Sequence, residues 1–162
     1  MANIVVVMGV AGSGKTTIGR MLAEATRCAF LEGDTLHSPE NVEKMSRGVP
    51  LTDADREPWL AAIHARMAAA YARGECLIVG CSALKDSYRR ILAGGLPVSW
   101  VYLKGSPDLI QDRMLARTDH FMKANMLVSQ FKALEEPSDA IVADVSESPD
   151  AIVGRILSQL RG

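Results

Sequence analysis

A glycine-rich run near the start of the chain has the residue types that hold a phosphate chain. It reads Gly9-Val10-Ala11-Gly12-Ser13-Gly14-Lys15-Thr16. In such a loop, glycines let consecutive backbone N–H groups face phosphate oxygens. Lys15 is expected to reach the β- and γ-phosphates, and the Thr16 hydroxyl to ligate Mg²⁺. We therefore expect residues 9–17, Thr17 included, to bind a nucleoside triphosphate together with Mg²⁺.

The segments on either side of this loop supply the structural context that the motif requires. The β-branched apolar residues 3–8 predict a buried parallel strand, and residues 17–25 have helical spacing. A helix that starts directly after the loop adds a partial positive charge beside the phosphates. The alternative is an ordinary glycine-rich turn before a helix, and the strand and helix together argue against it.

The rest of the chain alternates between short apolar strands and helices. Further strands are expected over residues 29–31, 76–80, 98–103 and 140–143. Further helices are expected over residues 40–46, 58–73, 85–92, 107–117, 125–134 and from 149 onward, with Ser38 and Pro39 as N-cap and first residue of the first of these. This alternation predicts an α/β fold with a five-stranded parallel sheet and helices on both faces. Ligands should bind beyond the carboxyl ends of the strands.

Asp34 follows the second expected strand, on the same edge of the sheet as the glycine-rich loop. A carboxylate there could accept a hydroxyl proton from a substrate, orient Mg²⁺, or do both. A turn or N-cap aspartate is the common alternative at such a position. His37 could line the same pocket or close a turn, and Glu32 could reach the site as well.

The third expected strand ends in Val79-Gly80-Cys81-Ser82, without the acidic residue that many ATPases use there to steady the metal. A Mg²⁺ ion held by Thr16, phosphates and water, with Asp34 close by, is consistent with this sequence. No partner that would activate a thiolate is evident near Cys81. We therefore expect Cys81 to be a small packed residue and not a nucleophile.

Cationic residues cluster in two later segments. Lys85, Arg89 and Arg90 follow the third strand, and Arg113, Arg117 and Lys123 flank a polar stretch after the fourth. Arg113 and Arg117 are four residues apart and share a helix face. Such a pair suits a small lid, at about residues 113–125, that closes over a transferring phosphoryl group and excludes water. A solvated helix face is the alternative.

Length and composition predict a single soluble domain over residues 1–162, with 48% hydrophobic and 23% charged residues. The net charge of −1 gives no basic field for nucleic acid or an anionic membrane. The apolar start is too short to span a bilayer and lacks the basic segment of a signal peptide. Cys28, Cys76 and Cys81 are odd in number and lack metal-ligand spacing, which predicts reduced thiols in a cytoplasmic protein.

Several further segments resemble the gluconate kinases. They are residues 31–48, which contain Glu32-Gly33-Asp34, residues 50–60, Cys81-Ser82-Ala83-Leu84-Lys85 with Tyr88-Arg89, His120-Phe121-Met122, and residues 126–131 and 134–137. Together with the glycine-rich loop they cover most of the chain. The loop alone marks a superfamily, whereas these segments in this order mark one family. Glu57 departs from the family, which often has lysine there.

The resemblance implies a nucleoside-monophosphate-kinase-like fold and a homodimer. It also implies transfer of the γ-phosphoryl of ATP to the 6-hydroxyl of D-gluconate, with Mg²⁺. For the gluconate carboxylate the candidates are Arg56, Lys85 and Arg89. For its hydroxyls they are His37, Lys44, His120 and Gln130. Asp34 is expected to orient or deprotonate the reacting hydroxyl, and Lys15, Arg113 and Arg117 to stabilise the phosphates. Residues 144–148 are expected to wall the adenine.

Two alternatives remain from the sequence. The first is another small-molecule kinase on the same fold, such as one for shikimate, because residues 14–20 have that character. The segment from Cys81 to Lys85 argues against it, since shikimate kinases have a glycine-rich stretch there. The second is a nucleotide-dependent switch without metabolite turnover. Asp34 and the paired arginines argue for an enclosed transfer site instead.

Overall fold

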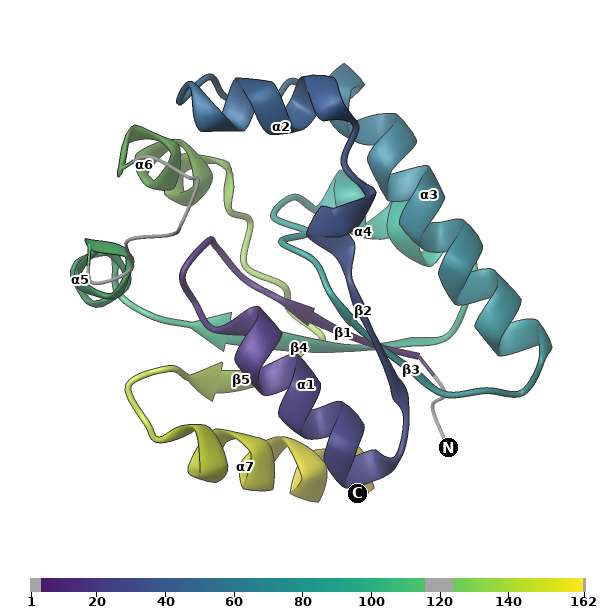
Figure 1. The fold of residues 1–162 in the computed structure, drawn as a ribbon. Coiled ribbons are helices and arrows are strands. Elements are labelled where there is room, and N and C mark those ends of the chain that lie inside the picture. Colours follow the sequence, from purple (N-terminus) through teal and green to yellow (C-terminus); the bar gives the residue numbers. More distant parts are fainter. Residues whose placement is uncertain (1–3, 116–123, 162) are drawn as a thin grey trace.

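A computed structural model describes residues 4–115 and 124–161, and its strands and helices alternate along the chain (Figure 1). The strands are β1 (Ile4–Met8), β2 (Ala29–Glu32), β3 (Leu77–Gly80), β4 (Val98–Lys104) and β5 (Ile141–Asp144). The helices are α1 (Lys15–Thr26), α2 (Pro39–Ser46), α3 (Asp53–Ala72), α4 (Asp86–Ala93), α5 (Pro107–Leu115), α6 (Ala124–Ala133) and α7 (Pro149–Arg161), with a short 3₁₀ helix over Gly33–Leu36.

The five strands form one parallel sheet in the order β2-β3-β1-β4-β5. The expected α/β fold is therefore confirmed. Because β3 lies between β1 and β2, the carboxyl ends of these three strands are neighbours at one edge of the sheet. The helices α2, α5 and α6 gather beyond that edge, around the loop that follows β1 (Figure 1).

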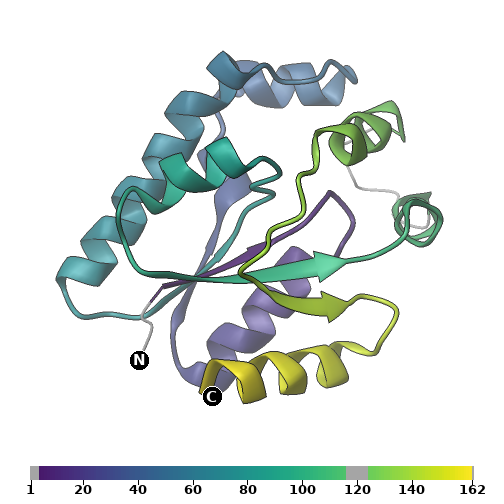
Figure 2. The same ribbon diagram turned by 180° about the vertical axis from the view of Figure 1, so that it is seen from behind.

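Successive residues of β1 point to opposite faces of the sheet and build two separate cores. Ile4, Val6 and Met8 pack on the side covered by α3 and α4, and Val5 and Val7 on the side covered by α1 and α7 (Figures 1 and 2). Burial on both faces explains why β1 is apolar throughout. Within residues 4–115 and 124–161, no helix combines the length and apolar content needed to cross a bilayer.

The start of α3 differs from the prediction, which put it at Pro58. The helix begins five residues earlier, at Asp53, because Thr52 and Asp55 form a capping box. The Thr52 hydroxyl accepts from the Asp55 N–H at 3.0 Å, and the Asp55 carboxylate accepts from the Thr52 N–H at 2.9 Å. These two bonds satisfy N–H groups at the helix start. Pro58 thus lies inside the helix, where it removes one backbone hydrogen bond.

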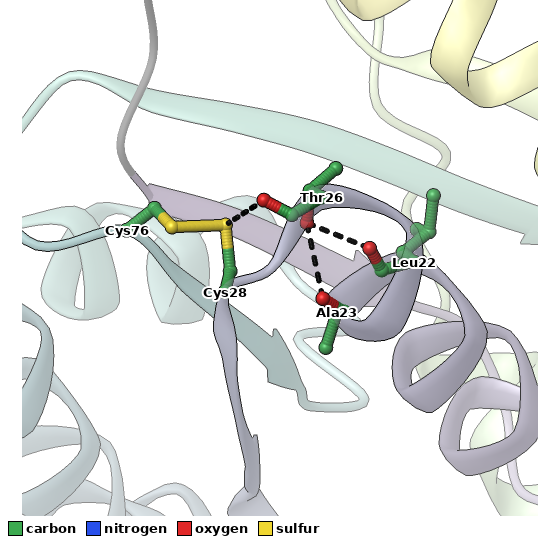
Figure 3. The surroundings of a disulfide bond; sticks show 5 residues. All are labelled: Leu22, Ala23, Thr26, Cys28 and Cys76. Carbon is green, nitrogen blue, oxygen red and sulfur yellow. Dashed lines mark hydrogen bonds between the residues drawn. A yellow bond between two sulfur atoms is a disulfide. The ribbon is translucent and has the colours of Figure 1, made fainter.

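The prediction of three reduced thiols is wrong for two of the cysteines. Cys28 and Cys76 form a disulfide, with Cα atoms 5.2 Å apart, beside the end of α1 (Figure 3). Their separation of 48 residues hid this pairing in the sequence. The sheet register explains it, because Ala29 of β2 pairs with Leu77 of β3 and thereby brings the two preceding cysteines together.

Candidate active site

The glycine-rich loop connects β1 to α1, and Gly9, Gly12 and Gly14 all have a positive φ there. Gly12 has a φ of 79° and Gly14 a φ of 98°, a left-handed region that side chains rarely adopt. Helix α1 begins at Lys15, directly after Gly14. Its first backbone N–H groups and the positive end of its dipole therefore face the loop. This combination is suited to binding an anionic phosphate chain.

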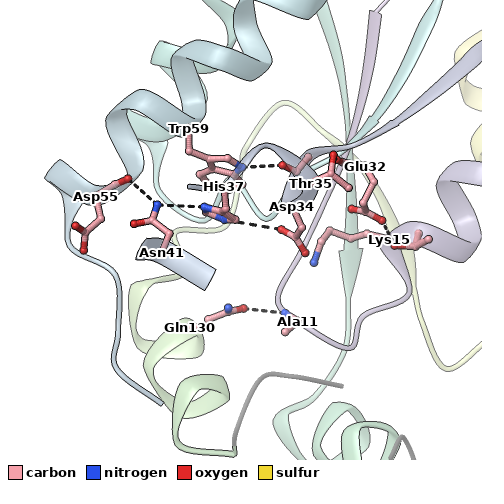
Figure 4. Close-up of polar contacts among 12 residues, drawn as sticks. Ala11, Lys15, Glu32, Asp34, Thr35, His37, Asn41, Asp55, Trp59 and Gln130 are labelled. Atoms are coloured by element: carbon pink, nitrogen blue, oxygen red, sulfur yellow. Dashed lines mark hydrogen bonds and ion pairs between the residues drawn. The ribbon is translucent and has the colours of Figure 1, made fainter. Parts of the chain in front are cut away.

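The side chain of Lys15 folds back over this loop. Its Nζ donates to the carbonyl oxygens of Gly9 and Val10, each at 3.0 Å. Burial lowers the pKa of Lys15, and the Asp34 and Glu32 carboxylates oppose that shift. The Asp34 carboxylate is directed toward the Lys15 ammonium (Figure 4). A phosphate bound in the loop would give this buried cation a further anionic partner.

A second contact joins the loop to β2. The Thr16 hydroxyl donates to the carboxylate of Glu32, the last residue of β2. Glu32 pairs in the sheet with Gly80, the last residue of β3, so it supplies a carboxylate at the edge where β3 has none. Hydroxyl and carboxylate oxygens are ligands that Mg²⁺ prefers. The pair fits a Mg²⁺ ion shared with nucleotide phosphates, a contact that the sequence indicated only weakly.

Asp34 lies in the 3₁₀ helix after β2 and is held there by α3. His37 Nε2 is 4.0 Å from the Asp34 Oδ1. The His37 ring stacks on Trp59, with centroids 4.0 Å apart and planes inclined by 16°. Trp59 Nε1 in turn donates to the Gly33 carbonyl at 2.8 Å. The indole of Trp59 therefore fixes both the turn that carries Asp34 and the imidazole beside it (Figure 4).

The imidazole of His37 is neutral at physiological pH. Burial lowers the pKa of His37 to about 4. The charge of Arg56 lowers this pKa as well, whereas the charge of Asp34 raises it. The Asn41 Nδ2 lies 3.3 Å from His37 Nδ1 and donates to the Asp55 carbonyl at 2.9 Å. Because an amide nitrogen only donates, Nδ1 accepts and the ring proton is on Nε2. His37 can thus donate one hydrogen bond toward Asp34 or a substrate hydroxyl.

Arg56 of α3 and Lys85, just before α4, gather around the ring of Tyr88. The Arg56 Cζ lies 5.2 Å and the Lys85 Nζ 5.5 Å from the ring centroid. Arg56 Nη1 donates to the Tyr88 hydroxyl at 3.2 Å and to the Leu51 carbonyl at 2.6 Å. Arg56 is also close enough to lower the pKa of His37. The structure therefore brings together two of the three cations expected to bind a carboxylate, and does so near His37.

The third expected cation, Arg89, is engaged elsewhere. It is buried, and its guanidinium donates to the carbonyls of Ala83 at 2.7 Å and Glu135 at 2.8 Å. Lys44 likewise forms an ion pair with Asp55 at 2.8 Å, which ties α2 to α3. Both side chains brace backbone around the site. Their proposed contacts with substrate stay predictions.

Gln130 of α6 and Arg113 of α5 each contact a loop beside the phosphate site. Gln130 Oε1 accepts from the Ala11 N–H at 2.8 Å (Figure 4). Arg113 Nη2 donates to the Val145 carbonyl at 2.5 Å, in the segment expected to wall the adenine. Their contacts with a substrate hydroxyl and with phosphate stay predictions. Two further expected site residues, Arg117 and His120, lie outside the described residues, as does the neighbouring Lys123.

Cys81 follows β3 at the floor of the site and is fully buried. Burial raises the pKa of its thiol to about 12, so a thiolate is negligible at neutral pH. This agrees with the expectation of a small packed residue. The chemistry available at the site is therefore that of Lys15, Thr16, Glu32, Asp34 and His37.

Comparison with known proteins agrees with this geometry. The family model described as shikimate kinase matches residues 11–161. The thermoresistant gluconokinase of Escherichia coli (strain K12) is 41% identical over 164 residues, which cover 98% of this chain and 94% of that protein. The gluconokinase of Gluconobacter oxydans (strain 621H) is 45% identical over 159 residues, covering 96% of this chain and 89% of that protein.

Solved structures give the same result. A sugar kinase from Janibacter sp. HTCC2649 superposes with a TM-score of 0.93 at 45% identity, covering 99% of this chain and 95% of its own. A gluconokinase from Sinorhizobium meliloti 1021 superposes with a TM-score of 0.89 at 45% identity, covering 98% and 91%. An APS kinase of Mycobacterium tuberculosis, at 15% identity and a TM-score of 0.75, shares the fold.

The parallel sheet, the phosphate-binding loop and the family match define an ATP-dependent P-loop kinase of small molecules. Within that class, the two curated relatives above are gluconokinases that are 41% and 45% identical to this chain over nearly their whole length. The chain belongs to the gluconokinase family.

Proposed function

We propose that this chain transfers the γ-phosphoryl group of ATP to the 6-hydroxyl of D-gluconate, yielding 6-phospho-D-gluconate and ADP. One observation carries the proposal beyond the family assignment. Asp34 faces the phosphate lysine Lys15, while Arg56 and Lys85 gather nearby around Tyr88. An acceptor with a hydroxyl at one end and a carboxylate at the other fits that arrangement.

The phosphate side of the reaction is assigned to the glycine-rich loop. Its backbone N–H groups and the N-terminus of α1 bind the triphosphate, and Lys15 balances the charge that spreads over the transferring group. Thr16 and Glu32 would hold Mg²⁺, which when bound neutralises charge on the phosphate oxygens. Arg113 of α5 and Arg117, which follows this helix in the sequence, are proposed to add cations.

The acceptor side is assigned to Asp34 and His37. As the bond from the 6-oxygen to phosphorus forms and the bond from phosphorus to ADP breaks, the hydroxyl proton passes to the Asp34 carboxylate. His37, neutral and protonated on Nε2, donates to a hydroxyl and keeps the acceptor oriented. Arg56 and Lys85 hold the carboxylate at the other end. Lys44, Arg89, His120 and Gln130 remain proposed acceptor contacts.

A coupled assay of ADP release tests this assignment. Purified protein with Mg²⁺ and ATP should phosphorylate D-gluconate far better than shikimate, glucose or nucleoside monophosphates. Glucose lacks the carboxylate that Arg56 and Lys85 are proposed to bind. If shikimate is the best acceptor, the acceptor site is misassigned. If ADP appears at the same rate without any acceptor, the chain is an ATPase or a switch.

We further propose that residues 1–162 act as a single kinase domain, in the cytoplasm and as a homodimer, with a lid at about residues 113–125. The homodimer rests on the resemblance to gluconate kinases, the single domain on the length of the chain, and the lid on the spacing of Arg113 and Arg117. Of the three cysteines, Cys81 alone supports the cytoplasm, because Cys28 and Cys76 form a disulfide. Light scattering coupled to size-exclusion chromatography measures the oligomeric state directly, and a mass of twice 17.5 kDa is expected. A monomer at micromolar concentration would contradict the homodimer.

A further inference from the structure

The cation cluster around Tyr88 already contains a carboxylate, that of Asp53. Asp53 is the first residue of α3, and its Oδ1 accepts from the Tyr88 hydroxyl. The same oxygen lies 3.4 Å from the Lys85 Nζ. The Asp53 side chain is 66% exposed, so it lies on the solvent side of a cluster whose ring is buried. A substrate carboxylate bound by Arg56 and Lys85 would thus come close to Asp53.

The charges of this cluster can be counted from the contacts. Hydrogen bonding from Tyr88 and the charge of Lys85 lower the pKa of Asp53, so Asp53 is ionised at neutral pH. Burial and the bond to Asp53 raise the pKa of Tyr88, so the phenol is neutral. Arg56 and Lys85 carry one positive charge each. The cluster therefore has a net charge of +1, which one carboxylate neutralises.

We infer that Asp53 is a specificity-determining residue. It holds the net charge of the acceptor site at +1, so that the site binds monoanionic sugar acids in preference to dianions. The inference rests on the proposed function. A dianion would leave one negative charge uncompensated beside Asp53, and like charges at such distances repel. Without Asp53, a cluster of net charge +2 would attract phosphorylated sugars and dicarboxylates. The charge of Asp53 therefore weakens the binding of these dianions.

A purely structural role for Asp53 predicts the opposite sign. If Asp53 only positions Tyr88 and Lys85, its loss should loosen the cluster and raise the KM of every acceptor. If Asp53 acts through its charge, its loss should lower the KM of anionic acceptors and leave neutral ones unaffected. The two readings are separated by comparing gluconate with D-gluconamide, which replaces the carboxylate by a neutral amide of nearly the same shape.

The test uses Asp53→Asn with Asp86→Asn as its matched control. Asp86 is the first residue of α4, as Asp53 is of α3, and it pairs at 2.8 Å with Arg90 outside the cluster. In Asp53→Asn the KM of gluconate should fall about three- to tenfold, the effect of removing one partly screened charge at close range. The KM of gluconamide should stay the same. Succinate is tested as a competitive inhibitor against gluconate at saturating Mg-ATP. The ratio of its inhibition constant to the gluconate KM should be lower in Asp53→Asn than in the unsubstituted protein.

Each result decides the matter. A fall in the gluconate KM that spares gluconamide and is absent from Asp86→Asn supports the inference. An unchanged or raised gluconate KM, a parallel change for gluconamide, or an equal change in Asp86→Asn overturns it. If the ratio of the succinate inhibition constant to the gluconate KM is the same in Asp53→Asn and the unsubstituted protein, the selection against dianions is overturned as well. The proposed function fails separately, in assays of the unsubstituted protein, if gluconate is not its preferred acceptor.

Discussion

Among single residues, Asp34 has the position expected of the group that receives the hydroxyl proton. It faces Lys15 on one side and His37 on the other (Figure 4). Asp34→Asn keeps the size of the side chain and one acceptor oxygen but cannot accept the proton. Loss of a general base typically costs ~10²–10⁴-fold in rate. We expect kcat to fall by about that factor at saturating gluconate and Mg-ATP, with little change in ATP binding.

The control for this variant is Glu40→Gln, which removes a carboxylate from the exposed first turn of α2. It should keep normal kcat. Near-normal kcat in Asp34→Asn would make Asp34 a turn residue and move the search for the base to Glu32 or His37. A loss of Mg-ATP affinity in its place would indicate that Asp34 acts on the metal.

His37 makes the stability of the folded state depend on pH. Its pKa is about 4 in the folded protein, below the ordinary value of 6.5. As the pH falls from 6.5 toward 4, the unfolded chain binds this proton first, so the folded state loses stability over that window. At pH 5 the loss should be about 2 kcal/mol relative to pH 7.

Urea denaturation at pH 7 and pH 5 measures this loss. The comparison is between the unsubstituted protein and His37→Gln, because other groups also titrate in this range. The drop in free energy of unfolding should be smaller in the variant by about 2 kcal/mol. Equal drops in the two proteins would mean that His37 titrates normally despite its stacking on Trp59.

At the scale of elements, α3 does most to shape the acceptor site. The capping box at Thr52 and Asp55 sets where the helix starts. From that start Asp53, Arg56 and Trp59 follow at intervals of three, so they lie along one side of the helix. That side meets Tyr88 through Asp53 and Arg56, and meets the turn after β2 through Trp59. One helix therefore connects the cation cluster around Tyr88 with the turn that carries Asp34.

The disulfide acts at the opposite ends of β2 and β3 from the site. It joins Cys28 to Cys76 across 48 residues. Cross-links over such lengths typically stabilise the folded state by roughly 2–4 kcal/mol, mainly by restricting the unfolded chain. Under non-reducing conditions we expect one titratable thiol per unfolded chain, that of Cys81, and three after reduction. Reduction should lower the denaturation midpoint of this protein.

The double variant Cys28→Ser, Cys76→Ser provides the control. Its midpoint should match that of the reduced protein and should not respond to reductant. Three titratable thiols in protein purified without reductant would contradict the disulfide. They would restore the expectation of free cysteines from the sequence.

At the scale of the whole molecule, the strand order assembles the site. Because β3 lies between β1 and β2, the carboxyl ends of these strands are adjacent. They lead into the phosphate loop after β1, the segment around Cys81 after β3, and the turn after Glu32 of β2. Ligands that bind there connect separate parts of the chain and stabilise the fold as a unit. Mg-ATP at 100 times its Kd should raise the free energy of unfolding by ~2.7 kcal/mol. Thermal melts with and without Mg-ATP measure the shift.

Lys15→Ala is the variant that isolates this effect. The cost of burying its ammonium offsets its two hydrogen bonds to loop carbonyls, so the melting temperature without ligand should stay close to that of the unsubstituted protein. The shift caused by Mg-ATP should shrink, and phosphoryl transfer should fall by several orders of magnitude. Chelation of Mg²⁺ by EDTA should likewise reduce the shift in the unsubstituted protein. A Lys15→Ala protein with near-normal turnover would remove the loop from the mechanism.

The sequence alone determined the phosphate loop, the alternation of strands and helices, and the family. These features are local: glycine spacing, apolar runs and caps depend on residues close in the chain, and even the displaced start of α3 is signalled by Thr52 and Asp55. Asp34 was found because a strand end predicts the ligand edge of a parallel sheet.

Only the tertiary structure decided which distant side chains meet. The pairing of Glu32 with Thr16 and the disulfide follow from strand order and register. The contact of Arg89 with the Glu135 carbonyl joins two loop-flanked segments that are 46 residues apart in the sequence. The gathering of Arg56, Lys85 and Asp53 around Tyr88 follows from the packing of α3 against α4. No local pattern encodes the contacts that Thr16, Cys28, Asp53 and Arg56 make, because their partners lie 16 to 48 positions away and meet them only when the whole chain packs.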